Sequence, residues 1–238
     1  CQKRKSNNLK ELGLFFLKNS YLLNNYFMIS DNKKIDSLCK FYFDGINLKN
    51  KKTEHYIEVA SNRAYRDLCR TLSGISKSSN SLTLRNEVNA LFCDYFNNLN
   101  IINAQKEFDE NFHEKICKEI IEIYKDFKVV DHRGQEVVFT YGHAQKWVNM
   151  TLKYLFILSQ YYINKEIDNI YRFCHMPIDS IIIKELCDKK IIKNFNIKKV
   201  WSKLNKERYD YIIGEIKKHI KEKKYKSMLD FEMEIWKS

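Results

Sequence analysis

A near absence of helix-breaking residues constrains this sequence more than any other feature. The 238 residues include one proline, Pro177, and six glycines. Apolar residues recur at the three- and four-residue spacings of an amphipathic helix over long segments. The sequence therefore predicts a mainly α fold, a compact multi-helix domain. The expected helices span residues 8–28, 34–44, 53–73, 83–98, 105–127, 141–163, 178–190, 206–224 and 229–236.

The segment KVVDHRGQEVVFT, residues 128–140, departs from this helical pattern. Two short β-branched runs flank a turn that contains Gly134, which predicts a short β-hairpin between two helices. No repeat or low-complexity linker divides the chain. We expect a single domain over residues 1–238, or two lobes, 1–104 and 105–238, with a cleft between them.

Composition and charge narrow the class of function. The chain is 44% hydrophobic and 14% aromatic, which is enough apolar material for a packed core. Its net charge of +12 predicts an anionic partner, for which nucleic acid is the usual candidate. The seven cysteines form no CxxC pair and no zinc-ligand spacing, and no apolar run reaches the length of a membrane span. We expect a cytoplasmic protein with no membrane span, metal or cofactor.

The segment YGHAQKWVNMTLKYLFILSQYY, residues 141–162, carries a polar stripe on an apolar helix. Gln145, Lys146, Asn149 and Lys153 fall within one arc about 100 degrees wide. This stripe faces either solvent, as most charged stripes do, or a polar cleft. In a cleft, a lysine amine beside apolar walls favours its neutral, nucleophilic form. Lys146 is then the candidate nucleophile and Lys153 its rival.

A candidate carboxylate partner lies in the segment HMPIDSIII, which places Asp179 two residues after Pro177. Proline and an acidic group both favour the first turn of a helix, the second because the helix dipole stabilises negative charge. Asp179 is therefore either a helix-start residue only or the carboxylate that a reactive lysine needs.

Together, YGHAQKWVNM and MPIDSII resemble the lysine and aspartate segments of the helix-hairpin-helix DNA glycosylases, in particular their 8-oxoguanine branch. The resemblance covers residues 105–190 and implies a DNA N-glycosylase, with or without lyase activity, that removes an oxidised or modified base. It implies that Lys146 attacks the sugar C1′ and that Asp179 activates the lysine or stabilises the sugar cation. The base would be flipped out of the duplex into a pocket. The residues close enough along the helix to line that pocket are His143, Gln145, Asn149 and Lys153.

Two features depart from the family pattern. The hairpin lacks the compact Leu-Pro-Gly-Val-Gly type of loop, which leaves His132 and Arg133 at its tip as candidate phosphate contacts. Lys146 and Asp179 are 33 residues apart (179 minus 146), more than is usual in the family. The segment SQYYINKEIDNIYRFC is therefore expected to add a helix between them.

Other basic groups are candidates for contacts to a nucleic-acid backbone. Arg63, Arg66 and Arg70 share one face of a predicted helix, either as phosphate contacts or as a surface on which Asp67 pairs with one of them. Residues 184–226 hold fifteen Lys and Arg against six Asp and Glu. These groups also suit two alternative functions, a non-catalytic nucleic-acid-binding protein and a helical interaction or defence module.

Overall fold

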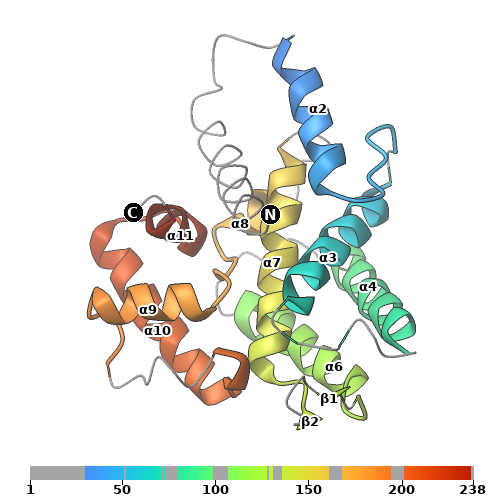
Figure 1. The fold of residues 1–238 in the computed structure, drawn as a ribbon. Helices are drawn as coiled ribbons and strands as arrows, with labels where there is room; N and C mark the ends of the chain where they lie inside the picture. Colours follow the sequence, from blue (N-terminus) through green and yellow to red (C-terminus); the bar gives the residue numbers. More distant parts are fainter. Residues whose placement is uncertain are drawn as a thin grey trace, which may run out of the picture.

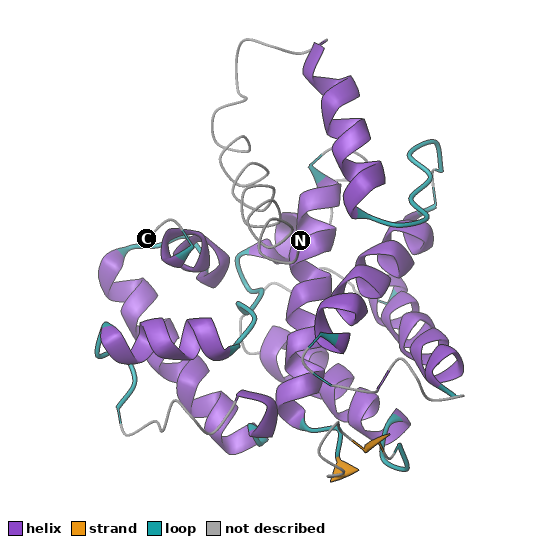
Figure 2. Cartoon of the chain, viewed as in Figure 1, coloured by secondary structure: helices purple, strands orange, loops and turns teal. Residues whose placement is uncertain are grey.

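The computed structural model shows a mainly helical chain, as the sequence predicts (Figures 1 and 2). The helix expected over residues 8–28 lies outside the described residues. None of the helices in the described part of the chain is long and apolar enough to cross a membrane. The structure describes residues 30–50, 52–70, 72, 75, 80–98, 107–127, 129–130, 136–160, 168–193 and 201–236.

The helices lie within a few residues of where the hydrophobic period places them, with one difference. The helix expected over residues 105–127 is divided into a π-helix and an α-helix, and the short α8 lies within the segment expected to add a helix. The elements are α2 (Ser30–Tyr42), α3 (Thr53–Cys69), α4 (Ser81–Asn97), the π-helix η2 (Phe108–Glu114), α6 (Lys115–Ile123), α7 (Tyr141–Ser159), α8 (Asp168–Tyr171), α9 (Ser180–Asp188), the 3-10 turn η5 (Trp201–Lys203), α10 (Lys206–Lys223) and α11 (Met228–Ile235).

Strands account for only four of the described residues. The strand β1 (Val129–Val130) pairs antiparallel with β2 (Glu136–Val137), and residues 131–135 between them lie outside the described residues. The structure does not support the hairpin predicted over residues 128–140, because it pairs only these four of the described residues.

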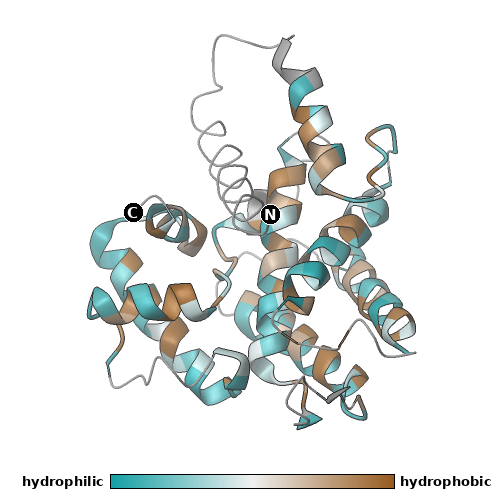
Figure 3. Cartoon of the chain, viewed as in Figure 1, coloured by the Kyte–Doolittle hydropathy of each residue, from teal (hydrophilic) through white to brown (hydrophobic). Residues whose placement is uncertain are grey.

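Helix α7 is the central element of the fold. It packs against α3 and α6 on one side and contacts η5 and α10 on the other, and Figure 1 shows it between the group α3, α4, α6 and the group α9, α10, α11. Hydrophobic and hydrophilic residues alternate along the helices (Figure 3). The apolar side of α7 is buried, and Trp147 at its centre donates Nε1–H to Ser61 Oγ of α3 (3.1 Å). The boundary between lobes expected at residue 104 falls within residues 99–106, outside the described residues.

The start of α7 is held against η5 and against Leu204, the residue that follows it. Thr140 caps the helix by accepting the His143 amide N–H at Oγ1 (3.3 Å), and it donates its hydroxyl to Ser202 O (2.6 Å). The Gly142 amide N–H is donated to Leu204 O (3.0 Å). A Cβ at residue 142 would overlap the carbonyl oxygen of Trp201. Gly142 therefore permits the close approach that brings Trp201 beside the first turns of α7.

Helix α9 begins at Asp179, as the Pro-x-Asp segment predicts. Asp179 is the N-cap, and its Oδ1 accepts the amide N–H groups of Ile181 (3.0 Å) and Ile182 (3.1 Å). A carboxylate at this position satisfies amides that have no partner within the helix and interacts favourably with the helix dipole. The cap uses one carboxylate oxygen and leaves the other, Oδ2, available.

Candidate active site

Lys146 and Asp179 form an ion pair that is mostly buried. Lys146 lies in the second turn of α7, and its Nζ donates to Asp179 Oδ2 at 3.4 Å. The two side chains are 10% and 19% exposed, so the pair is partly open to solvent. The Lys146 ammonium also lies 4.5 Å from the centre of the Trp201 ring, a cation–π geometry. The structure thus joins the two residues that the sequence singled out.

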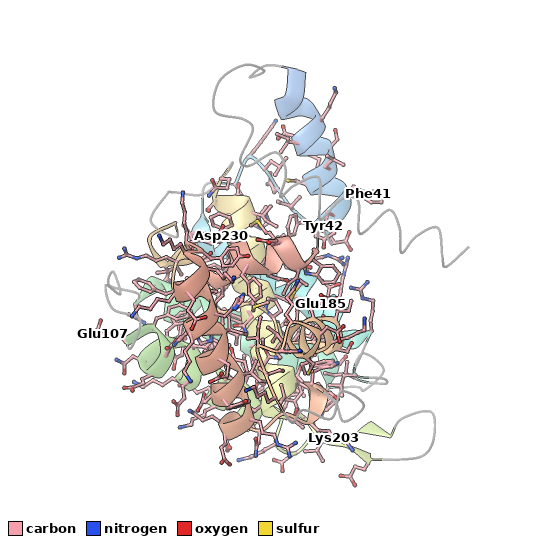
Figure 4. The ribbon with its side chains drawn as sticks, turned by 90° about the vertical axis from the view of Figure 1, so that its left-hand side faces the viewer. Phe41, Tyr42, Glu107, Glu185, Lys203 and Asp230 are labelled. Atoms are coloured by element: carbon pink, nitrogen blue, oxygen red, sulfur yellow. The ribbon has the colours of Figure 1, made fainter. Side chains whose placement is uncertain are left out.

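The Lys146–Asp179 pair lies where α7, the start of α9 and η5 meet. Figure 4 labels Glu185 on α9 and Lys203 at the end of η5, and these labels mark the two segments that carry Asp179 and Trp201 toward α7. The exposed edges of Lys146 and Asp179 are therefore bordered by one aromatic ring and by the start of one helix.

The polar stripe of α7 faces the protein interior. Gln145 and Asn149 have no exposed surface, and Lys146 is also buried, with 10% of its side chain exposed. The solvent-facing alternative is therefore excluded. The loop of residues 173–178, all of them buried, packs against the stripe and leads directly into Asp179.

Gln145 and Asn149 use their hydrogen-bonding groups on this loop. Gln145 accepts the Ile178 amide N–H at Oε1 (3.2 Å) and donates Nε2–H to Ile178 O (2.8 Å). Asn149 Nδ2 lies within bonding distance of Met176 O (3.2 Å) and the Tyr209 hydroxyl (3.0 Å). A substrate contact, which the sequence suggested for Gln145 and Asn149, would require both side chains to leave these bonds.

A chain of buried polar groups continues from Asn149 toward the surface. Asn149 Oδ1 accepts Nε2–H of His113 (2.8 Å). The Tyr209 hydroxyl donates to His175 Nδ1 (2.8 Å), and His175 donates Nε2–H to Asp109 (2.6 Å). Burial lowers the pKa of both histidines, so they are neutral at neutral pH. These buried groups therefore have hydrogen-bond partners within the core, as the burial of polar side chains requires.

Sequence reasoning missed this network. Asp109 and His113 both lie in the π-helix η2, a local change of helical period that the hydrophobic pattern does not reveal. His175 lies two residues before Pro177, and its place among the buried polar groups depends on Tyr209 of α10. The one sequence feature that pointed to this network is the CHMPID segment. It places a histidine close to Pro177, just before a helix, which is unusual in a chain with so few helix-breaking residues.

His143 lies behind Trp201 and is almost fully buried. Its Nδ1 accepts the Thr140 amide N–H (3.1 Å), which completes the cap of α7. Burial, with a smaller contribution from the charge of Lys146, lowers the pKa of His143 to about 4. The neutral His143 ring therefore stabilises the start of α7, where it also contacts Trp201.

Lys153, the rival nucleophile, belongs to a different part of the molecule. Its Nζ donates to Glu232 Oε1 of α11 at 2.7 Å, and Trp236 Nε1–H is donated to the same oxygen (3.1 Å). The Glu232 side chain is 3% exposed, so this is a buried ion pair. The structure thus separates Lys153 from Asp179 and pairs only Lys146 with it.

Arg63 and Arg66 of α3 and Arg70 at its C-cap each pair with a carboxylate. Arg63 and Arg70 both contact Asp67, and Arg66 contacts Asp44. Arg63 is also largely buried, with its guanidinium over the Tyr42 ring (4.2 Å). The predicted phosphate contacts His132 and Arg133 lie outside the described residues. Several basic side chains after α9 and in α10 form no ion pair within the described part of the chain, among them Lys189, Lys190, Lys193, Lys221 and Lys223.

Metal ligands do not gather in the described part of the chain, where no group of three or more His, Cys, Asp or Glu residues could hold an ion. Comparisons of the sequence and the structure with models of protein families, with curated proteins and with solved structures found no match. The functional argument therefore depends on the geometry of the site.

Proposed function

We propose that this protein is a DNA N-glycosylase, with or without lyase activity, in which Lys146 is the nucleophile and Asp179 is its acidic partner. The observation that carries the proposal is the 3.4 Å contact between Lys146 Nζ and Asp179 Oδ2, formed by residues 33 positions apart. The N-cap position of Asp179 supports it further, because one oxygen holds α9 while the other faces the amine.

The chemistry would follow from this arrangement. Asp179 accepts a proton from the Lys146 ammonium, and the neutral amine then forms a bond to C1′ of the sugar. The glycosidic C–N bond breaks, and the departing base takes up a proton. Loss of a further proton from nitrogen and opening of the sugar ring give a Schiff base, whose hydrolysis releases the lysine. A carboxylate beside the sugar also stabilises positive charge that develops on it.

The net charge of +12 supports a polyanionic substrate. Arg63, Arg66 and Arg70 are offset in part by the two carboxylates of Asp44 and Asp67, so they contribute less to this attraction than the sequence suggested. The lysines after α9 and in α10 that form no ion pair with a described residue are the better candidates for backbone contacts. His132 and Arg133 remain predictions for the turn between β1 and β2.

Borohydride trapping tests the proposal. The protein is incubated with duplexes that carry a panel of oxidised, deaminated and alkylated bases, and sodium borohydride reduces any Schiff base to a stable adduct. We expect an adduct with the unchanged protein and none with Lys146→Gln. Lys153→Gln is the matched control, since it removes a lysine from the same helix, and it should retain the adduct once circular dichroism confirms that it is folded.

Base release is measured in parallel, because a glycosylase that uses water gives no adduct. In that case Asp179→Asn should abolish release while DNA binding stays equal or becomes tighter. Neither adduct nor base release on any duplex of the panel would overturn the proposal. An adduct that survives in Lys146→Gln would overturn the assignment of the nucleophile.

A non-catalytic nucleic-acid-binding protein is the second candidate, favoured by the lysines after α9 and in α10 that form no ion pair within the described residues. Its binding would weaken steeply with salt, by a slope of about 0.9 per phosphate contact, and Lys146→Gln would change it no more than any other single lysine. The third candidate, a helical interaction or defence module, would bind neither DNA nor RNA at low salt.

A further inference from the structure

Gln145 is an internal polar side chain next to Lys146, and its partner, Ile178, is next to Asp179. The Gln145 carboxamide has no exposed surface, and it forms two hydrogen bonds with the Ile178 residue, one to its amide and one to its carbonyl. Gln145 directly precedes Lys146, and it binds the residue that directly precedes Asp179. It therefore links the backbone beside Asp179 to the helix that carries Lys146. The other α7 side chain that hydrogen-bonds this loop, Asn149, does so at Met176, further from Asp179.

The orientation of this carboxamide is set by its neighbours. Asn149 donates Nδ2–H to Gln145 Oε1 (3.1 Å), so that oxygen faces the Ile178 N–H, and Gln145 Nε2 donates its second hydrogen to Gly142 O (2.9 Å). Asn149 is oriented in turn by His113, which donates to its Oδ1. Exchanging the nitrogen and oxygen of Gln145 would place two donors against each other at Ile178.

The N-cap bonds of Asp179 cannot provide this alignment. They fix the carboxylate relative to α9, because both donors, Ile181 and Ile182, belong to that helix. The position of the carboxylate relative to α7 depends on how the loop before it is attached to α7. The bonds of Gln145 to Ile178 make that attachment, with Asn149 supporting it at Met176.

We propose that Gln145 is a positioning residue that holds the carboxylate of Asp179 against the amine of Lys146. The sequence suggested that Gln145 lines the substrate pocket, but the structure buries it, and we give it a positioning role instead. The inference rests on the proposed function only in so far as the Lys146–Asp179 pair is the reactive pair. The alignment itself can be measured in the absence of DNA, which separates the two hypotheses.

Competitive labelling of lysine amines measures the alignment. The folded protein is treated with a trace of acetic anhydride, and mass spectrometry gives the labelling rate of Lys146 relative to Lys153 and Lys184 in the same sample. In the unchanged protein the contact with Asp179 slows the reaction of Lys146. A partly exposed ion pair contributes about 0.2–1 kcal/mol, so loss of the contact should speed labelling by about fivefold at most.

The variants are Gln145→Met, which keeps the length of the side chain without its polar atoms, and Asp179→Asn. We expect each to raise the labelling of Lys146 alone, and we expect the double variant to label no faster than Asp179→Asn, because both changes remove the same contact. Lys153, in the same helix but paired with Glu232, should keep its rate. A purely structural role for Gln145 would lower stability without selecting Lys146.

Three outcomes would overturn the inference. The first is that Lys146 in Gln145→Met is labelled at the same rate as in the unchanged protein. The second is that the labelling of Lys146 and Lys153 accelerates together. The third is that Asp179→Asn does not change the labelling rate of Lys146. If Gln145→Met does not fold, Gln145→Glu replaces it, since a buried Glu carries a proton and can both accept and donate at Ile178. Gln145→Glu should restore slow labelling in part, and a rate equal to that of Asp179→Asn would count against the inference.

The trapping assay then relates the alignment to chemistry. If the protein is a glycosylase, Gln145→Met should lower the rate of adduct formation while DNA affinity stays unchanged, because Gln145 touches no solvent. If no duplex is a substrate, the labelling result stands by itself, and only the proposed function fails.

Discussion

Replacement of Gly142 by alanine tests the contact that brings Trp201 to the candidate site. An added Cβ would overlap the Trp201 carbonyl oxygen and would lie 3.2 Å from its carbonyl carbon and 3.3 Å from Leu204 N. These atoms belong to the backbone, so no side-chain rotation relieves the overlap. The segment of residues 201–204 must move away from α7.

The cost can be worked out from the contacts that this movement breaks. The hydrogen bonds from Gly142 to Leu204 O and from Thr140 to Ser202 O contribute about 1 kcal/mol each. Overpacking adds about 1–3 kcal/mol, and the better helix propensity of alanine offsets about 1 kcal/mol. We expect Gly142→Ala to lower the free energy of unfolding by about 2–4 kcal/mol, a large part of the 5–15 kcal/mol typical of a domain.

Urea unfolding followed by far-ultraviolet circular dichroism measures this change. Gly214→Ala is the matched control, because Gly214 lies inside α10 with no atom within 4 Å of an added Cβ. It should stabilise the protein by about 0.5–1 kcal/mol through helix propensity alone. A Gly142→Ala variant as stable as Gly214→Ala would show that α7 and η5 do not approach in solution as the structure describes.

Three further predictions concern charges inside the fold. Lys153→Met and Glu232→Leu should each cost about 3 kcal/mol or more in urea unfolding, because each leaves a buried charge without its partner, and the double variant should cost less than their sum. Burial acts to raise the pKa of Asp109, but His175 and Lys217 outweigh it and lower that pKa to about 2. Asp109 therefore stabilises the fold above pH 4, and the free energy of unfolding should fall by about 2 kcal/mol as the pH falls from 4 to 2. Urea unfolding of Asp109→Asn at each pH should not show this fall. The lowered pKa of His143 means that the unfolded chain binds its proton first, so stability falls as pH drops from 6.5 to 4. His143→Gln should flatten that part of the urea-unfolding profile by up to about 3 kcal/mol.

Local interactions allowed much of the helical architecture to be predicted from the sequence. The 3.6-residue period placed α3, α7 and α10 within a few residues of their observed bounds, because apolar residues recur at helical spacing where one face of a helix is buried. The start of α9 at Asp179 was predicted for a similar reason, because a cap depends on residues within one turn. The pairing of Lys146 with Asp179 was a hypothesis from the carboxylate that a reactive lysine needs and from the resemblance, and no local rule could have decided it.

The tertiary structure alone decided what surrounds the polar side chains. The period of α7 gave the stripe Gln145, Lys146, Asn149 and Lys153, but it could not say whether water or protein faces it. Packing of the loop of residues 173–178 and of α11 made that decision, directing Lys146 to Asp179 and Lys153 to Glu232. The physical reason is that helix formation depends on neighbours a few residues away, whereas the partner of a buried polar group depends on segments distant in sequence that close packing brings together.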